Sequence, residues 1–538
     1  MASNKRWAYA WLLMGVFALG VRLGAAQRAY PCAGDAGHFV QHGVALANGV
    51  PGAMSTYWSQ GMIALAAGGV KLGLDPRRVL QGATLVSGLL QVVFFAWLLY
   101  LLTRSHGLSY AGGWFMAVSP AMVQHSITGY SEMPYMAFLT MGICVGVLGL
   151  SNRHRWLWLA GGLIGLGGYF KGPDAAIAAC GFGLFALLWT KGGWQKKVLM
   201  AGIVPIAAFV VLIPLCTFTY LRTGTFAPSA KGQGNLMFVL KGGDWTDSKA
   251  GYSVDTGRYA QGRAVRKTGI DWNAICHTPK RMVPNAVESV RVFNRQIFSR
   301  GFRMGTFWFF LFVTGAAYVW WRKRDRRALL PLCLLVIQLA MLSLVFVHSR
   351  ILLPSLPWLV LLLLLSGAHL WNQGPAQRWI LGVVLAAYLT VNARYALDAF
   401  ESEFFWWRYA NIEVCAKELK KLGGTDADVV MSYGPTLAVE FNQTNPLKTV
   451  EVPYGTIEQV SEIADQNHVR FIVVSDAFRT HWPIARLFDE GVPSPANWAL
   501  REELVFPEEE WTGSRGHPAE RCRIYERLPM IATKGVER

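Results

Sequence analysis

Acidic residues are scarce over most of this chain. The first 397 of its 538 residues contain 10 Asp and Glu against 36 Lys and Arg, and only 16% of the whole chain is charged. Soluble domains average about 25% charged residues, so this composition argues against a soluble cytosolic enzyme. The 8 cysteines include no CxxC pair and no zinc-finger spacing. Neither an internal repeat nor a heptad run is present, which excludes solenoids and coiled coils.

Apolar residues dominate instead, at 53% of the chain with 22 Trp. A membrane-spanning helix needs about 20 mostly apolar residues. Eleven stretches come near that length: 7–26, 79–102, 108–124, 133–150, 156–170, 174–190, 198–221, 302–321, 329–347, 351–369 and 379–397. The sequence therefore predicts a polytopic α-helical membrane protein with about 11 transmembrane helices. The glycine-rich stretch 59–74 is shorter, and we expect it to form a helix at the membrane interface.

The cations in the short loops predict the orientation of the chain. Alternate loops between the predicted spans contain Lys or Arg, namely 103–107, 151–155, 191–197, 322–328 and 370–378. Because cytoplasmic loops are enriched in these residues, we expect a multi-pass inner (plasma) membrane protein with a cytoplasmic N-terminus. Arg22 interrupts the first apolar stretch, which favours an uncleaved anchor over a signal peptide.

This topology divides the chain into two regions. Residues 1–397 form the transmembrane domain, with a first outer loop over 27–78 and a large outer loop over 222–300 that contains thirteen Lys and Arg against five Asp and Glu. A basic surface beside a bilayer attracts anionic lipids. Nucleic acid is not an expected partner, because this face is extracytoplasmic and no recognition motif accompanies it.

Residues 398–538, called the tail below, carry 15 Lys and Arg against 23 Asp and Glu. Short apolar runs predict strands over 427–433, 448–454, 470–476 and 521–528, and helical patterns lie between the second and third of these and over 482–491. Strands that alternate with helices are typical of a small α/β domain. We therefore expect an extracytoplasmic α/β domain that positions the acceptor or has a structural role.

Two features of the tail depend on its compartment. Cys415 and Cys522 fall on the outer side, as do Cys32 and Cys276, and an oxidising compartment permits disulfides there. A Cys415–Cys522 bond is one option, since spacing alone does not fix connectivity. The sequon at Asn442 (Asn-Gln-Thr) is a formal glycosylation site whose use depends on the host.

Asp35 follows the first predicted span and begins a helical pattern. On a helix Asp35, His38 and His42 share one face. The carboxylate could deprotonate an incoming hydroxyl, or the three side chains could bind a divalent metal ion. Asp35 could also simply cap an interfacial helix whose histidines face water. Spacing alone favours the cap and leaves the other two roles open.

Further ionisable residues lie at the same predicted membrane face. Glu132 begins the fourth span, Lys171 ends the fifth, and Asp174 begins the sixth. Arg350 begins the tenth, with His348 beside it. Helix-dipole compensation by an acid and snorkelling by a cation explain such positions individually. The gathering of a base candidate, a second acid and two cations at one face favours a site where the cations bind a phosphate.

Four segments resemble, in order, those of the GT-C glycosyltransferases, and in particular the protein O-mannosyltransferase and lipid A aminoarabinose transferase-like superfamily. They are DAGHFVQHGVALANG (35–49), SEMPYMAF (131–138), GLGGYFKGPDA (165–175) and SRILLPSLPWLVLLL (349–363). The resemblance covers about residues 1–400. The family usually has Asp-Glu where this chain has Asp35 and Ala36, and a Pro-Pro-Leu stretch where it has WSQGMIALA (58–66).

The resemblance implies inverting transfer of a sugar from a polyprenyl-phosphate-linked donor to a protein, lipid or glycan acceptor at the extracytoplasmic face. It implies that Asp35 is the general base, and that Glu132 positions a cation or the sugar hydroxyls. Lys171 and Arg350 would stabilise the leaving phosphate. His38 and His348 would complete the substrate site. A divalent metal ion on Asp35, His38 and His42 remains an alternative.

Two other classes of function compete with this one. A lipid-linked sugar transporter or flippase predicts paired repeats and broken helices with charges near the membrane centre. A non-catalytic lipid-binding component of a cell-envelope glycan assembly system would tolerate Asp35→Asn, whereas an enzyme would not. The residues identify neither the sugar nor the acceptor.

Overall fold

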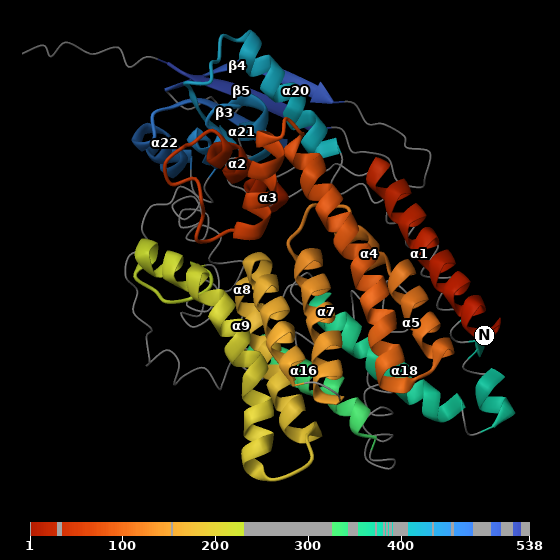
Figure 1. The fold of residues 1–538 in the computed structure, drawn as a ribbon. Coiled ribbons are helices and arrows are strands. Elements are labelled where there is room, and N and C mark those ends of the chain that lie inside the picture. The colour runs from red at the N-terminus through yellow and green to blue at the C-terminus, as the bar shows by residue number, and fades with distance from the viewer. Residues whose placement is uncertain are drawn as a thin grey trace, which may run out of the picture.

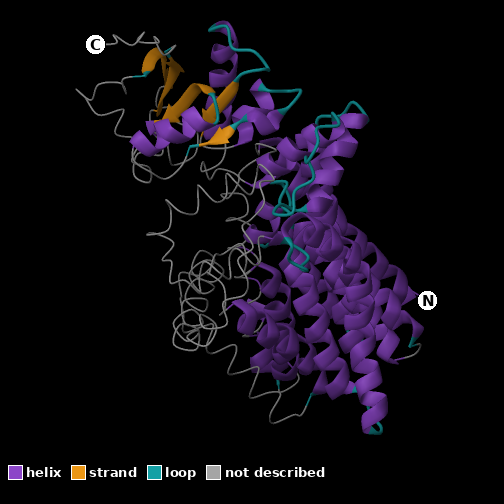
Figure 2. Cartoon of the chain, turned by 90° about the vertical axis from the view of Figure 1, so that its left-hand side faces the viewer, coloured by secondary structure: helices purple, strands orange, loops and turns teal. Residues whose placement is uncertain are grey.

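The computed structural model describes two parts of the chain, shown as ribbons in Figures 1 and 2. The first comprises residues 2–28, 35–151, 154–230, 325–342, 353–371 and 374–379, with a few positions between 382 and 390. The second comprises residues 407–432, 435–452, 457–476, 497–506 and 520–528 of the tail. The first part is a bundle of helices, and the second contains a β-sheet.

Five helical segments of the described chain are long and apolar enough to cross a membrane: Tyr9–Gln27, Pro76–Thr103, Glu132–Ser151, Arg155–Trp189 and Trp194–Thr223. They belong to α1 (Ala2–Arg28), α4 (Pro76–Thr103), α7 (Glu132–Ser151), α8 (Arg155–Trp189) and α9 (Trp194–Thr223). Large apolar side chains such as Leu12, Leu199 and Leu221 point outward and are 60–77% exposed. Lipid rather than water suits so apolar an outer surface. The protein is a multi-pass helical membrane protein.

The helix α8 consists of two antiparallel limbs that meet at Lys171, whose backbone is non-helical (φ −150°, ψ 77°). Gly161 in the first limb packs against Ala207, and Gly183 in the second packs against Ala201. The two glycines would be about 33 Å apart along a straight helix, whereas the two alanines of α9 are about 9 Å apart. The chain therefore reverses direction at Lys171. The predicted spans 156–170 and 174–190 correspond to these limbs.

The segment predicted as one span over 108–124 is two helices. They are α5 (His106–Val118) and α6 (Pro120–His125), which the extended backbone of Ser119 separates. Pro120 has no N–H to continue the hydrogen bonding of α5. The expectation of a single spanning helix here is therefore wrong.

The other described helices of the first part are short. They are α2 (Asp35–Ala47), α3 (Gln60–Lys71), α16 (Leu329–Leu342) and α18 (Leu356–Trp371), with 3₁₀ turns η2 (Arg326–Ala328) and η3 (Leu353–Ser355). Ser59 caps α3 by accepting from the N–H of Met62 at 3.4 Å. Twelve residues are too few to span a membrane, so α3 is a short helix as expected, and its place at the membrane interface stays a prediction. Figure 1 shows α2 and α3 between the bundle and the tail, at what we call the α2 end of the bundle.

The later predicted spans are only partly visible. The described part of 329–347 corresponds to α16, and that of 351–369 to η3 and α18. The segment 302–321, most of 379–397 and the basic loop from residue 231 onward lie outside the described residues. The count of 11 spans therefore stays a prediction.

The tail contains a five-stranded sheet of order β2-β1-β3-β5-β4. Its strands are β1 (Val429–Ser432), β2 (Val450–Glu451), β3 (Val469–Ser475), β4 (Trp498–Phe506) and β5 (Glu520–Arg527). The first three run parallel, whereas β5 is antiparallel to β3 and β4. The strands β1, β2, β3 and β5 coincide with stretches that the sequence predicts as strands.

Helices cover both faces of this sheet. They are α20 (Trp407–Lys421), α21 (Pro435–Phe441) and α22 (Ile457–Gln466), and a 3₁₀ turn η4 (Pro446–Lys448) follows α21. Successive strand residues face opposite sides: Met431 packs with α22, and Val430 packs with α20 and α21. The helix predicted over 482–491 lies outside the described residues. The division of the chain at 397/398 into two domains stays a prediction.

Candidate functional site

The reversal of α8 brings Lys171 into contact with two carboxylates. Its Nζ atom lies 3.6 Å from Oε1 of Glu132 and 3.4 Å from Oδ2 of Asp174. Glu132 begins α7 and is buried, and Asp174 lies in the first turn of the second limb of α8. Helix dipoles favour acids at both positions. We call these three residues the rim cluster, and it joins two residues that the sequence predicted for the site.

Neighbouring groups fix the position of the rim cluster. The hydroxyl of Tyr135, one turn after Glu132, donates to the backbone carbonyl of Asp174 at 2.9 Å. A β-carbon on Gly172 would lie only 2.7 Å from Cβ of Pro228, so glycine is needed where the turn approaches the chain after α9. The ends of α7, of both limbs of α8 and of α9 therefore meet around Lys171.

Asp35 is the first residue of α2, and the following ten residues of this helix are buried. The ring of His38 stacks on Trp58, with centroids 4.2 Å apart and an interplanar angle of 12°. Nδ1 of His42 lies 2.7 Å from the carbonyl oxygen of Ala53. Because a carbonyl only accepts, Nδ1 carries the proton and Nε2 is the acceptor in neutral His42. Burial lowers the pKa of His42 to about 4, despite the hydrogen bond to Ala53 and with a smaller contribution from the charge of His38.

A shared apolar cluster connects α2 to the rim cluster. Phe39, Trp58 and Tyr130 belong to it, and Phe170 packs against it. Tyr130 lies two residues before Glu132, and Phe170 immediately precedes Lys171. The hydroxyl of Ser59 also donates to the carbonyl of Tyr169 at 3.3 Å. The helix that begins with Asp35 and the rim cluster thus lie at the same end of the bundle (Figure 1).

The charges of the rim cluster differ from the arrangement expected for it. The sequence predicted Lys171 as a cation available for a phosphate, whereas two carboxylates already contact it. The ammonium group of Lys171 is therefore already engaged by the two acids on either side of it. Arg350 and His348, the other predicted substrate-binding residues, lie outside the described residues, as does most of the basic outer loop.

The described residues do not assemble a metal site. Nδ1 of His42 is occupied by Ala53, and the ring of His38 stacks on Trp58. Within the described ranges no three His, Cys, Asp or Glu side chains are grouped so that they could hold a metal ion. The Asp35–His38–His42 set thus does not fit a divalent ion as a three-ligand site, and no step is derived through one.

Comparison with known proteins identifies the fold through structure rather than sequence. No protein-family model and no curated protein sequence matches the chain. The oligosaccharyltransferase of Archaeoglobus fulgidus, tethered with an acceptor peptide, superposes with a TM-score of 0.57 at 12% identity over 88% of this chain and 69% of that one. Its complex with Zn and sulfate gives a TM-score of 0.55 at 11% identity, over 87% and 68%.

A second similar structure is ArnT from Cupriavidus metallidurans bound to undecaprenyl phosphate. Its TM-score is 0.51 at 13% identity, over 87% of this chain and 94% of that one. These proteins are polytopic membrane glycosyltransferases of the GT-C type. The chain described here is therefore a multi-pass membrane protein with the GT-C fold, as the order of its sequence motifs predicted.

The structure adds residues that sequence reasoning did not assign to the site. Asp174 was noted only as an acid at the outer edge, although its i, i+3 spacing from Lys171 is a signal for an ion pair. Trp58 and Tyr130 were not predicted at all. Nothing local in the sequence indicates that Trp58 stacks on His38, because the loop that carries it is irregular.

Proposed function

We propose that this protein is an integral membrane glycosyltransferase. It moves a sugar from a polyprenyl-phosphate-linked donor to a protein, lipid or glycan acceptor on the extracytoplasmic side, with inversion at the anomeric carbon. The observation that carries the proposal is the contact of Glu132 with Lys171 at the α2 end of a GT-C bundle, where Asp35 also lies. The N-terminus is cytoplasmic in this proposal, and the tail is extracytoplasmic.

The similar structures support both substrate classes. ArnT is bound to undecaprenyl phosphate, and the archaeal oligosaccharyltransferase is tethered with an acceptor peptide. A donor with a long lipid chain also suits a bundle whose outer surface carries exposed leucines.

Asp35 is the general base of the proposed reaction. Its carboxylate removes the proton of the acceptor nucleophile, which attacks the anomeric carbon on the face opposite the phosphate. The bond from that carbon to the phosphate oxygen breaks as the new bond forms, and polyprenyl phosphate leaves with the electron pair. This in-line displacement inverts the anomeric carbon.

The rim cluster orients the substrates in this mechanism. Lys171 holds the carboxylates of Glu132 and Asp174 in fixed positions, where their oxygens can accept hydrogen bonds from sugar hydroxyls. The charge that develops on the leaving phosphate needs further cations. Arg350, with His348 beside it, and the basic loop 222–300 supply these in the sequence, and the same loop attracts anionic lipids.

The test is turnover by the purified protein. Wild type is incubated with a panel of polyprenyl-phosphate sugars and a host membrane extract, and release of free polyprenyl phosphate is followed. Asp35→Asn is expected to lower release by at least about 100-fold, the smaller value typical of a lost general base. Asp75→Asn is the matched control, because Asp75 caps α4 and an asparagine caps equally well.

Three further results bear on the proposal. Full release by Asp35→Asn would contradict the assignment of the base. Binding of several donors with consumption of none would overturn the transferase and favour carrier binding or transport, which movement of a fluorescent lipid-linked sugar across a vesicle would then test. Loss of release with EDTA and recovery with a divalent cation would support a metal-assisted reaction.

A further inference from the structure

The helix α21 and the turn η4 of the tail pack against α2, and the short segment between them accepts hydrogen bonds from the α2 side through its backbone carbonyls. Nε2 of Gln41, a buried side chain, donates to the carbonyl of Pro446 at 2.8 Å. Nδ2 of Asn48 donates to the carbonyls of Gln443 (3.2 Å) and Thr444 (2.9 Å). Gln41 lies within α2, and Asn48 directly follows the last residue of that helix, Ala47. We call residues 443–446 the clamp segment.

The clamp segment is fastened to the sheet of the tail. Asn442 directly precedes it, and its fully buried side chain donates to the carbonyls of Asp426 (3.2 Å) and Asp428 (2.9 Å), just before β1. Asn445 accepts from the N–H of Leu447 at 3.3 Å and so caps the turn η4. Displacement of α2 would therefore have to move the segment that leads into β1 or break these hydrogen bonds.

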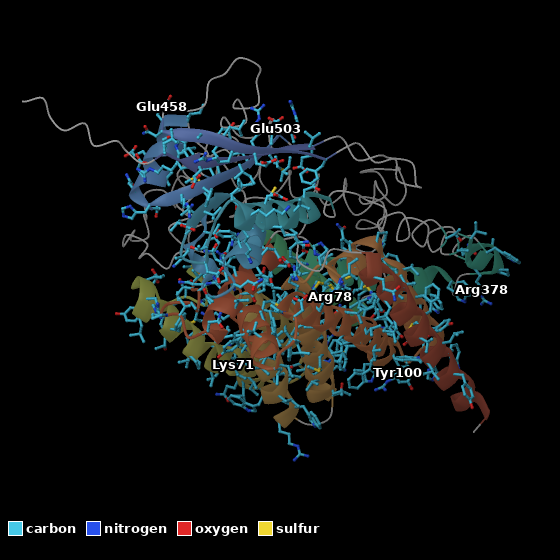
Figure 3. All side chains as sticks on the ribbon, turned by 90° about the horizontal axis from the view of Figure 1, so that it is seen from above. Lys71, Arg78, Tyr100, Arg378, Glu458 and Glu503 are labelled. Atoms are coloured by element: carbon cyan, nitrogen blue, oxygen red, sulfur yellow. The ribbon has the colours of Figure 1, made fainter. Side chains whose placement is uncertain are left out.

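A second contact ties the tail to α4. Arg77, at the start of that helix, lies 3.1 Å from Glu413 of α20 and also pairs with Glu440 of α21 and with Asp75. Both of these partners in the tail lie on helices. In Figure 3 the labelled Glu503 of β4 lies away from the labelled Arg78, the neighbour of Arg77 in the chain. Arg77 lies on α4 and not on α2, so its substitution weakens docking of the tail without removing the hydrogen bonds to the clamp segment, which provides a control.

We propose that the clamp segment positions α2 for catalysis, and that Gln41 and Asn48 are the positioning residues through which it acts. α2 has 13 residues, and helices this short are marginal without tertiary contacts. Asp35 is its first residue, so a tilt of α2 moves the base relative to the rim cluster. Misplacement of a catalytic group by about 1 Å can cost on the order of 100-fold in rate. The catalytic consequence rests on the proposed transferase function, whereas the mechanical one does not.

The test compares donor-removing variants with a docking control. Gln41→Glu and Asn48→Asp keep the shape of each side chain but replace the amide donor with an acceptor that faces carbonyls. Both are expected to lower kcat at least about tenfold, with KM for the donor within about twofold of wild type. Asn48→Gln retains an amide donor and is expected to retain kcat. Arg77→Gln weakens docking at α4 and is expected to lower Tm with kcat unchanged.

Hydrogen exchange of α2 provides a readout that needs no activity. The amides of 35–47 are expected to exchange faster in Gln41→Glu and Asn48→Asp than in wild type, and at the wild-type rate in Arg77→Gln. Unchanged exchange and kcat in both donor-removing variants would overturn the proposal. Equal loss of kcat in Arg77→Gln would also overturn it, because docking alone would then account for the effect.

Hydrogen exchange of α2 tests the role of the clamp segment independently of the transferase reaction. If wild type consumes no donor, the proposed function fails, yet the exchange of α2 still decides whether the clamp segment holds that helix. If Gln41→Glu does not fold, Asn48→Ala at an exposed position gives the same comparison, since Asn48 lies on the surface. Faster exchange of α2 in Asn48→Ala supports the proposal, and wild-type exchange contradicts it.

Discussion

Arg22 of α1 donates a hydrogen bond to the backbone carbonyl of Met116 in α5, at 3.4 Å. In a continuous helix that oxygen would accept from residue 120, which is proline and has no N–H. Arg22 also donates to the carbonyl of Ala117 at 3.1 Å and to the hydroxyl of Ser126 at 3.2 Å. A fully buried arginine from one helix thus caps the broken end of another.

Arg22→Met is therefore expected to destabilise the bundle. Each buried carbonyl that loses its donor costs about 1–3 kcal/mol, and two carbonyls are affected, so a loss on the order of 3 kcal/mol is expected. Thermal unfolding in detergent measures the change, and Gln27→Met at an exposed position of the same helix is the control. A Tm equal to that of the control would show that other donors satisfy these carbonyls.

Removal of Lys171 is expected to leave the rim cluster with uncompensated negative charge. Breaking a buried ion pair at one partner typically costs about 3–5 kcal/mol, so Lys171→Met should lower Tm and abolish release of polyprenyl phosphate. Lys171→Arg keeps the charge and should be milder. Because Glu132→Gln removes one of the two acids, the double variant should recover part of the stability of Lys171→Met but none of its activity. A fully additive double variant would argue against the pairing.

Much of the bundle is predictable from the sequence, for a physical reason. An apolar run of about 20 residues in lipid must satisfy its backbone internally, and a helix does so. This holds for α4, α7, α9 and both limbs of α8. The break at Ser119 was not predicted, although Pro120 is a local signal for it. Its capping by Arg22, which lies about a hundred residues earlier in the chain, has no local signal. Local periodicity in the sequence does not predict such long-range contacts.

Acid is expected to weaken the fold through His42. Burial lowers its pKa to about 4 in the folded protein, from about 6.5 in an unfolded chain. As the pH falls from 6.5 to 4, the unfolded chain binds a proton at His42 that the folded protein does not. The free energy of unfolding therefore contains the full contribution of His42 above about pH 6.5. Between pH 6.5 and pH 4 this contribution falls, by ~3 kcal/mol at pH 4.

The comparison of wild type with His42→Asn measures this effect. Asparagine keeps a donor for the carbonyl of Ala53 but does not titrate. The fall in Tm between pH 7.5 and pH 4.5 is expected to be larger in wild type than in His42→Asn. Equal falls would show that His42 does not contribute to the pH dependence.

Cys415 and Cys522 face one another in the buried core between α20 and β5. One turn earlier on α20, Asn411 donates to Glu520 of β5 at 2.6 Å, which fixes the alignment of the two elements. Contact with Cys415 and burial raise the pKa of the Cys522 thiol. Both thiols are free in this structure. We expect a disulfide between them when the tail lies in an oxidising compartment and a thiol–disulfide oxidoreductase accepts the two electrons, with release of two protons.

Peptide mass spectrometry without reductant checks this expectation, and with it the orientation of the chain. The cross-linked peptide should be present in protein isolated from the membrane, while Cys144, buried in α7, should remain a thiol. Two free thiols at Cys415 and Cys522 in that sample would contradict an extracytoplasmic tail.

The site is less predictable from the sequence than the bundle. The sequence placed Glu132 and Lys171 at one membrane face, and the structure brings them into contact because α8 reverses next to α7. It gave no indication that Gln41 contacts Pro446, which lies 405 residues later. Periodicity reports which side of a helix is buried, and it does not report which distant segment covers that side.

The buried side chain of Asn442 has a consequence for biosynthesis. An oligosaccharide can be attached to this sequon only before the tail folds, because both hydrogens of its amide group later bond to carbonyls in the interior. In a host with N-glycosylation the glycan would therefore mark the molecules in which modification came before folding. The fraction of glycosylated chains would then report how fast the tail folds relative to glycosylation in a living cell.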